Sequence, residues 1–190
     1  MRRVFLEGYS FSSGLRESVR RQYEPELSRE QLTLVLEGLR NWFLACLCSG
    51  RRTLGMPSRA VDDAWHDFIL MSRAYHTFCD EVFGRYLHHT PDFEMAEPMP
   101  GALAKTLSVL EKYRLDHPPH VPSTPGVPFL FAVDSLVGVE DGYEWTPERI
   151  AELRRGEGGT SGGGSCGSGE GSGSSCGGGS CGGGGCGGGG

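Results

Sequence analysis

The chain has 190 residues and a formal net charge of −6. This negative balance gives no reason to expect binding to nucleic acid or to an acidic membrane surface. The longest apolar candidate is residues 41–48, far short of the ~20 residues of a membrane span, and Glu7 interrupts the apolar stretch that a secretory signal would need. We therefore expect a cytoplasmic protein that does not bind a membrane.

Glycine divides the chain into two parts of different character. Of the 31 glycines, 21 lie in residues 156–190. Residues 1–155 contain enough apolar side chains to bury a core, whereas the glycine-rich part does not. We predict a single all-α domain of about four to five helices over residues 1–155, with its core at about residues 10–115. A disordered Gly/Ser/Cys tail is expected over residues 156–190.

The first firm helix is expected from about Arg29 to Cys48. Ser28 and Gln31 form a capping box, in which each side chain satisfies a backbone amide at the helix start. Apolar residues then recur every three or four positions, as in a helix with one buried face. Upstream, Leu15 and Val19 indicate a shorter amphipathic helix of one or two turns.

A second helical pattern runs from Arg59 to Phe83, with Ser58 as its N-cap. Its apolar residues, Trp65 among them, cluster on one broad face at about 100° per residue. The pattern spans 25 residues, longer than the usual ~8–20, so a kink near Met71 is an alternative to one continuous helix.

The remaining segments complete the helical prediction. A third helix is expected over residues 101–115, and a terminal helix over residues 147–155 begins with Thr146 as N-cap and Pro147 in its first turn. Between them, residues 116–140 begin with a proline-rich stretch that favours extended chain. The apolar run FLFAVDSLVGV within this segment is expected to be a strand or an extended segment lying across the helices.

A polar stripe follows the shoulder of the second helical pattern. Asp62, His66, Arg73 and Asp80 share one side if the helix is continuous. Asp62 and His66 lie one turn apart, so they can form a carboxylate–imidazole pair that raises the basicity of the free ring nitrogen. Such a pair suits a metal ligand or a general base.

Two histidines after Gly84 could approach this pair where the chain turns back. His88 and His89 therefore suggest a site for zinc or another divalent metal, built from Asp62, His66 and one of the two. The alternative is a structural stripe that ties the helix to its neighbour, because no HExxH or CxxC spacing is present.

The cysteines fall into two groups. Cys79 and Cys46 lie on apolar helix faces and are expected to be core thiols. The tail thiols are spaced ten, five and five residues apart. Four interpretations are open: the thiols have no role, they bind zinc together, they form disulfides, or they are modified after synthesis. The four tail thiols are Cys166, Cys176, Cys181 and Cys186.

The segment around Trp65 resembles the glycine-rich domain-containing protein family, known from plants with scattered bacterial relatives. Its motif reads approximately Asp-x-x-Trp-His-x-His-x-Leu-x-Pro-x-x-Tyr. The resemblance covers about residues 28–136 and implies a helical domain of uncharacterised biochemistry, with no catalytic residue to carry over. The positions that match in register are Asp62, Trp65, His66, Leu70 and Tyr75.

Two positions depart from that motif. The second His of the motif is Phe68 here, which removes a potential metal ligand. The Pro is Ser72, which favours a longer continuous helix. Shorter bacterial members are similar also in the segments RAYHTFC, FGRYLHH and LFAVD.

Three functions remain open from the sequence. The leading hypothesis is a non-enzymatic interaction or adaptor module with an unknown protein partner. The second is a metal-binding protein or metal-dependent enzyme that uses Asp62, His66 and a His of the His88-His89 turn. The third is a precursor with a modified tail, because Ser-Cys pairs within polyglycine resemble those of azole-containing peptides of the microcin type.

Overall fold

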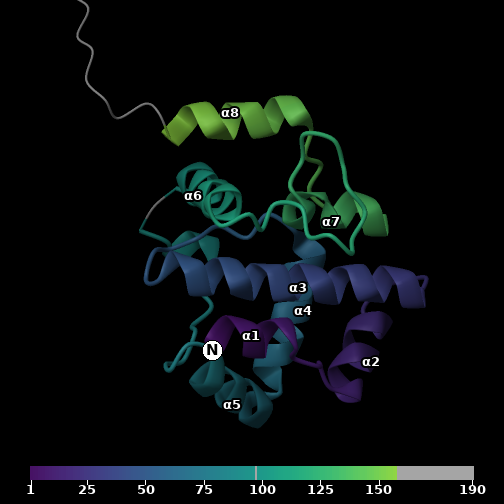
Figure 1. Cartoon of the computed structure of the whole chain (residues 1–190). Coiled ribbons are helices and arrows are strands. Elements are labelled where there is room, and N and C mark those ends of the chain that lie inside the picture. The colour runs from purple at the N-terminus through teal and green to yellow at the C-terminus, as the bar shows by residue number, and fades with distance from the viewer. Residues whose placement is uncertain (97, 158–190) are drawn as a thin grey trace, which may run out of the picture.

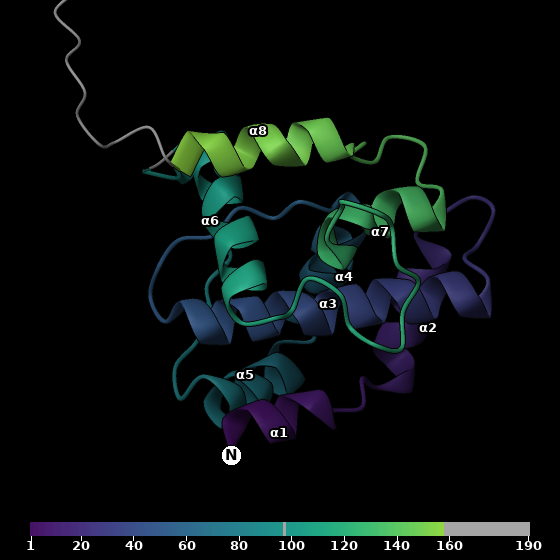
Figure 2. The same cartoon turned by 45° about the horizontal axis from the view of Figure 1, so that its top comes forward.

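The longest helix, α3 (Arg29–Ser49), crosses the middle of the molecule in the computed structural model, which describes residues 1–96 and 98–157 (Figure 1). Helices α1 and α5 lie on one side of α3, and α6, α7 and α8 lie on the other, in both views (Figures 1 and 2). Helix α2 lies on the side of α1 in Figure 1 and passes behind α3 in Figure 2. Helix α4 crosses α3 and contacts α2 on one side and α7 on the other. Helix α3 is therefore the shared wall of the core.

The all-α fold class is confirmed for the described residues, which contain eight α-helices and no β-strand. This number exceeds the four to five helices expected, because residues 2–7 and 129–137 also form helices and the helical pattern over residues 59–83 is divided into two. The elements besides α3 are α1 (Arg2–Glu7), α2 (Ser13–Arg21), α4 (Arg59–Leu70), α5 (Ser72–Val82), a 3-10 turn η1 (Asp92–Glu94), α6 (Met99–Lys112), α7 (Phe129–Val137) and α8 (Pro147–Glu157).

Helix α3 begins with the predicted capping box. Ser28 Oγ accepts from Gln31 N over 3.2 Å, and Gln31 Oε1 accepts from Ser28 N over 2.9 Å. Further along, Gly38 lets α4 and α7 approach closely, because a Cβ there would lie 2.6 Å from Val61 Cγ2 and 3.1 Å from Val133 Cγ2. The crossing of the three helices thus depends on a missing side chain.

Helix α3 is also long and apolar enough to cross a membrane by length and composition. However, 61% of its apolar stretch is buried by other parts of the chain. Trp42 and Phe43, near its centre, are 3% and 0% exposed. These values are those of the core helix of a helical bundle.

Of the two expectations for residues 59–83, the break near Met71 is confirmed and the continuous helix is wrong, since the chain divides at Met71 into α4 and α5. Met71 has φ −78° and ψ 53°, outside the helical region. The break lets α5 fold back, so that Tyr75 and Phe78 pack on Phe68 with ring centroids 5.2 and 5.1 Å apart. Burial of these rings explains the turn, although Ser72 replaces the helix-breaking proline of the motif.

The expectation of a strand or extended segment near residues 129–139 is also wrong, because Phe129–Val137 forms α7. Nearly every side chain of α7 is buried, so the sequence shows a continuous apolar run without the one-sided period of a surface helix. Gly138, with φ +78° and ψ 41°, ends the helix in the left-handed conformation that favours glycine.

A buried carboxylate of α7 fixes the start of α4. Asp134 is 2% exposed; its Oδ1 accepts from Ser58 Oγ (2.6 Å) and Ala60 N (3.0 Å), and its Oδ2 accepts from Arg59 N and Tyr143 N (both 2.8 Å). These bonds satisfy amides that a helix start leaves without partners, and the negative charge complements the helix dipole. Asp134 thereby holds in place the helix that carries the candidate site.

The terminal helix is confirmed, with Thr146 Oγ1 accepting from Arg149 N over 3.3 Å. It extends to Glu157, two residues beyond the predicted end. The rest of the predicted tail and its four cysteines lie outside the described residues, so the division at residue 155 stays a prediction.

Candidate metal centre

Asp62 and His66 lie one turn apart on α4, at the edge of its buried face. Trp65, between them in sequence, is 4% exposed, whereas the side chains of Asp62 and His66 are 30% and 48% exposed. The polar pair therefore faces outward beside an anchored indole, as the periodicity predicts. Asp62 Oδ2 lies 3.9 Å from His66 Nδ1.

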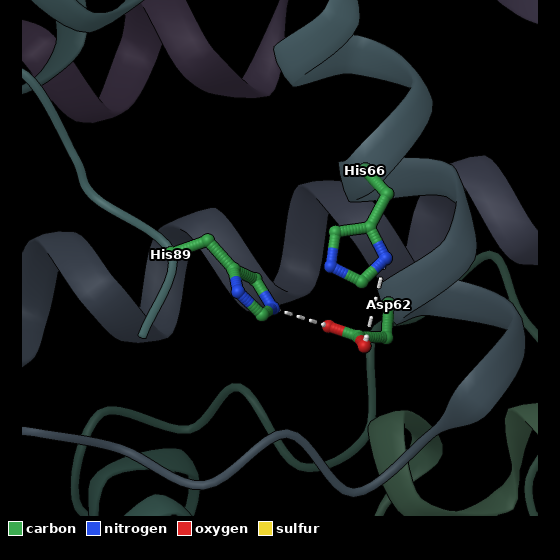
Figure 3. A group of neighbouring side chains, drawn as sticks. All are labelled: Asp62, His66 and His89. Atoms are coloured by element: carbon green, nitrogen blue, oxygen red, sulfur yellow. Dashed lines mark hydrogen bonds and ion pairs between the residues drawn. The ribbon is translucent and has the colours of Figure 1, made fainter. Parts of the chain in front are cut away.

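His89 joins this pair from the segment that follows α5. Its Nε2 lies 3.1 Å from Asp62 Oδ1, and its ring centroid lies 4.4 Å from that of His66 (Figure 3). One donor atom from each of the three residues falls within 4.8 Å of the others. Figure 3 shows the carboxylate of Asp62 facing both imidazole rings.

A chain of two hydrogen bonds holds the segment of His89 against α4. Trp65 Nε1 donates to Tyr75 Oη over 3.0 Å, and Tyr75 Oη donates to the carbonyl oxygen of Leu87 over 2.6 Å. Burial raises the pKa of the Tyr75 hydroxyl, which keeps the proton that this bond requires. His89 then packs on Trp65, with ring centroids 4.8 Å apart.

The three donor atoms lie within 4.8 Å of one another, and two of their separations can be compared with those around a bound ion. Bonds of about 2.0–2.2 Å to one metal place neighbouring donors roughly 3.0–3.5 Å apart. The Asp62–His89 separation of 3.1 Å already satisfies this range. The 3.9 Å between Asp62 Oδ2 and His66 Nδ1 exceeds this range, so metal binding would require the half-exposed His66 side chain to move closer to Asp62.

The other predicted polar residues are not part of this cluster, although His88 lines the hollow into which the cluster opens. His88 is exposed and packs on Tyr86, with ring centroids 4.8 Å apart. Asp80 instead pairs with His76 over 3.1 Å, and Arg73 lines a shallow groove on α5. The single stripe of four residues is therefore wrong, because it required α4 and α5 to be one helix.

The cluster opens into a hollow of about 640 Å³. Apolar side chains, among them Trp42, Trp65 and Leu54, form part of its wall. The wall also carries several arginines, which the sequence does not predict as a group, although two of them are adjacent shortly after α3. The arginines that line the hollow are Arg51, Arg52, Arg59 and Arg85.

The core thiols are not placed for chemistry. Cys46 lines the hollow but is 7% exposed, and burial raises the pKa of its thiol, an effect that the charge of Arg85 only partly offsets. Burial likewise raises the pKa of the Cys79 thiol, which is fully buried. Both groups are therefore neutral at pH 7 and lack the thiolate that a nucleophile needs.

Comparison with the motif of the glycine-rich domain-containing proteins separates two roles. Asp62 and His66 point to the hollow, whereas Trp65 and Tyr75 hold the segment that carries His89. Phe68, at the position of the second motif His, is 2% exposed and faces the core. A histidine at this position would therefore face the core and not the cluster.

No curated protein and no solved structure matches the chain. A family model described as UCP032817-like matches residues 1–169. This description names no activity, so the match assigns membership without chemistry. The matched range includes every residue of the cluster and of the hollow. The chain belongs to the UCP032817-like family.

Proposed function

We propose that this protein binds one divalent metal ion, such as Zn²⁺, through Asp62, His66 and His89. The observation that carries the proposal is the approach of one carboxylate and two imidazoles to within 4.8 Å at the edge of a hollow. Two imidazole nitrogens and one carboxylate oxygen form a donor set that suits zinc or ferrous iron.

The ligand count has a consequence for chemistry. Three protein ligands leave at least one coordination position open, as in catalytic rather than structural metal sites. Because the cluster lines the hollow, the open position would face a space that a small molecule can enter. A metal there could polarise a ligand oxygen or activate water.

An interaction module with an unknown protein partner is a second candidate function. No surface of the described residues favours an interaction module in the way that the cluster favours a metal, so we place that function second. The cytoplasmic location and the relation to glycine-rich domain-containing proteins are likewise proposals. The modified-tail hypothesis concerns residues outside those that the structure describes.

Metal titration of the full chain tests the proposal. The four tail cysteines are first replaced by serine, so that their thiols cannot bind the probe. Co²⁺ added to this protein is expected to bind one equivalent and to give visible d–d bands without thiolate charge transfer. His66→Ala and His89→Ala should each weaken binding by 10-fold or more, whereas His88→Ala should not. Binding that is absent, or equally strong in all three variants, would refute the proposal.

A further inference from the structure

We infer that the hollow binds a small organic anion, whose carboxylate or phosphate group is held by Arg51, Arg52 and Arg85. The inference deepens the proposed function, because an oxygen of the same ligand could then reach the metal. The arginine contacts do not themselves depend on a metal, so the two proposals can fail separately.

The wall of the hollow carries more positive than negative side chains. Four arginines line the hollow, while Asp62 is its one carboxylate among the described residues. Clefts lined by one sign of charge focus the field and concentrate ions of the opposite sign. The hollow is therefore suited to an anion, although the whole chain carries a net charge of −6.

Three of these four arginines have no carboxylate partner among the described residues. The guanidinium groups of Arg51 and Arg52 pair with no acidic side chain among the described residues. Arg85 Nη2 donates to the carbonyl oxygen of Gly50 over 2.8 Å, which leaves its charge uncompensated. Only Arg59 has a carboxylate nearby, Asp141 at 3.4 Å, and that pair is exposed to solvent. Three guanidinium groups thus remain able to bind an oxyanion through paired N–H donors.

The apolar side chains of the wall indicate that the ligand also has an apolar part. The indoles of Trp42 and Trp65 lie 5.6 Å apart, and Leu54 and Met99 also line the hollow. The buried Nε1 of Trp42 has no acceptor within the described part of the chain. A wall that combines apolar side chains with charged and polar groups, around a volume of about 640 Å³, fits a small molecule that carries both an apolar part and an acid group.

Calorimetric titration of the full chain with two aromatic anions, phenyl phosphate and benzoate, tests the inference, with neutral benzyl alcohol for comparison. We expect at least one anion to bind and benzyl alcohol to bind at least 10-fold more weakly. Affinity for the anion should fall as salt rises. The anion that binds more tightly identifies the acid group. Equal binding of all three compounds, or binding of none, would overturn the inference.

Arginine variants test whether Arg51 and Arg52 bind the anion. The double variant Arg51→Ala/Arg52→Ala should weaken anion binding by 10-fold or more, while its Co²⁺ spectrum stays unchanged. The matched control Arg29→Ala/Arg155→Ala also removes two exposed arginines, but neither lines the hollow, so its affinity should equal that of the parent chain. Equal affinity in the two double variants would overturn the anion site.

The two proposals are separated by repeating the titration without metal. Anion binding that depends on Arg51 and Arg52 in a chain that takes up no Co²⁺ would support the anion site and refute the metal centre. Co²⁺ uptake with no anion binding would do the reverse.

Discussion

Trp65 Nε1 lies 3.0 Å from Tyr75 Oη, although ten residues separate the two in sequence. In a continuous helix, ten residues would rise by about 15 Å, so these groups could not meet. The break at Met71 is therefore what closes the bond. Because Tyr75 also holds the carbonyl oxygen of Leu87, the same bond places His89 beside Asp62. Trp65 and Tyr75, which are both motif positions, thus hold His89, which lies outside the motif, beside Asp62.

Tyr75→Phe is expected to loosen the candidate site and destabilise the fold. The change leaves the indole N–H of Trp65 and the carbonyl oxygen of Leu87 without partners, at a cost of about 1–3 kcal/mol. Metal affinity should fall roughly 10-fold or more, because the segment of His89 loses its anchor. Urea unfolding and Co²⁺ titration measure the two effects. The control is Tyr86→Phe, since the Tyr86 hydroxyl makes no hydrogen bond with the described residues; equal losses in both variants would contradict the positioning role.

Asp134→Asn is expected to destabilise the protein by about 3 kcal/mol. The amide can keep one oxygen for Ser58 and Ala60, but its NH₂ group would face the N–H donors of Arg59 and Tyr143. Asp141→Asn serves as control, because Asp141 is 80% exposed and its surface pair is worth at most about 1 kcal/mol. Thermal unfolding that shifts equally in both variants would contradict the anchoring role of Asp134.

Gly38→Ala is expected to destabilise the protein despite the better helix propensity of alanine. Its Cβ would fall 2.6 Å from Val61 Cγ2, and overpacking typically costs about 1–3 kcal/mol, against a propensity gain of roughly 1 kcal/mol. In a Val61→Ala background the same change should cost less. Gly14→Ala is the control, because its nearest neighbour lies 3.8 Å away. A stabilised Gly38→Ala variant in urea unfolding would show that the crossing tolerates a side chain.

Asp63 provides a pH-dependent prediction. Burial raises its pKa above the ordinary value of 3.8, and the hydrogen bond from Tyr23 only partly opposes this effect. A carboxyl whose pKa is higher in the folded state costs stability once pH rises above 3.8 and through the raised value. At pH 7 the cost is fully present. Asp63→Asn keeps an oxygen for Tyr23 and removes the charge.

Melting temperatures across pH test this account of Asp63. Asp63→Asn should melt above the parent chain at pH 7, and the gap should close below pH 3.8. The exposed Asp141 supplies a matched control, since Asp141→Asn should show no such gap. A variant that melts lower than the parent at pH 7 would show that the negative charge of Asp63 is stabilising.

The sequence predicts the elements whose signals are local. The capping box of Ser28 and Gln31 and the terminal helix after Thr146 both depend on side chains a few residues apart, and both are confirmed. The sequence of α7 predicts extended chain instead of a helix, because a helix buried on nearly all sides has no polar face that would show its period. Its capping carboxylate, Asp134, acts 75 residues away from Arg59, which no local pattern can indicate.

In the candidate site, too, local spacing predicts some features, while others depend on contacts between residues distant in sequence. Asp62 and His66 are one helical turn apart, so their pairing follows from spacing alone. The sequence could not choose between His88 and His89, because the choice depends on the Trp65–Tyr75–Leu87 hydrogen bonds formed across the break at Met71. The arginines of the hollow come from separate segments, and only packing brings them to one wall.

Anomalous X-ray scattering from crystals of the zinc-loaded protein tests the central claim most directly. Data collected above and below the zinc absorption edge locate the ion without reference to any assumed ligand. The account predicts one anomalous peak about 2.0–2.2 Å from an oxygen of Asp62 and from one ring nitrogen each of His66 and His89. A zinc-loaded crystal with no peak at these three side chains, or with its peak elsewhere on the chain, would contradict it.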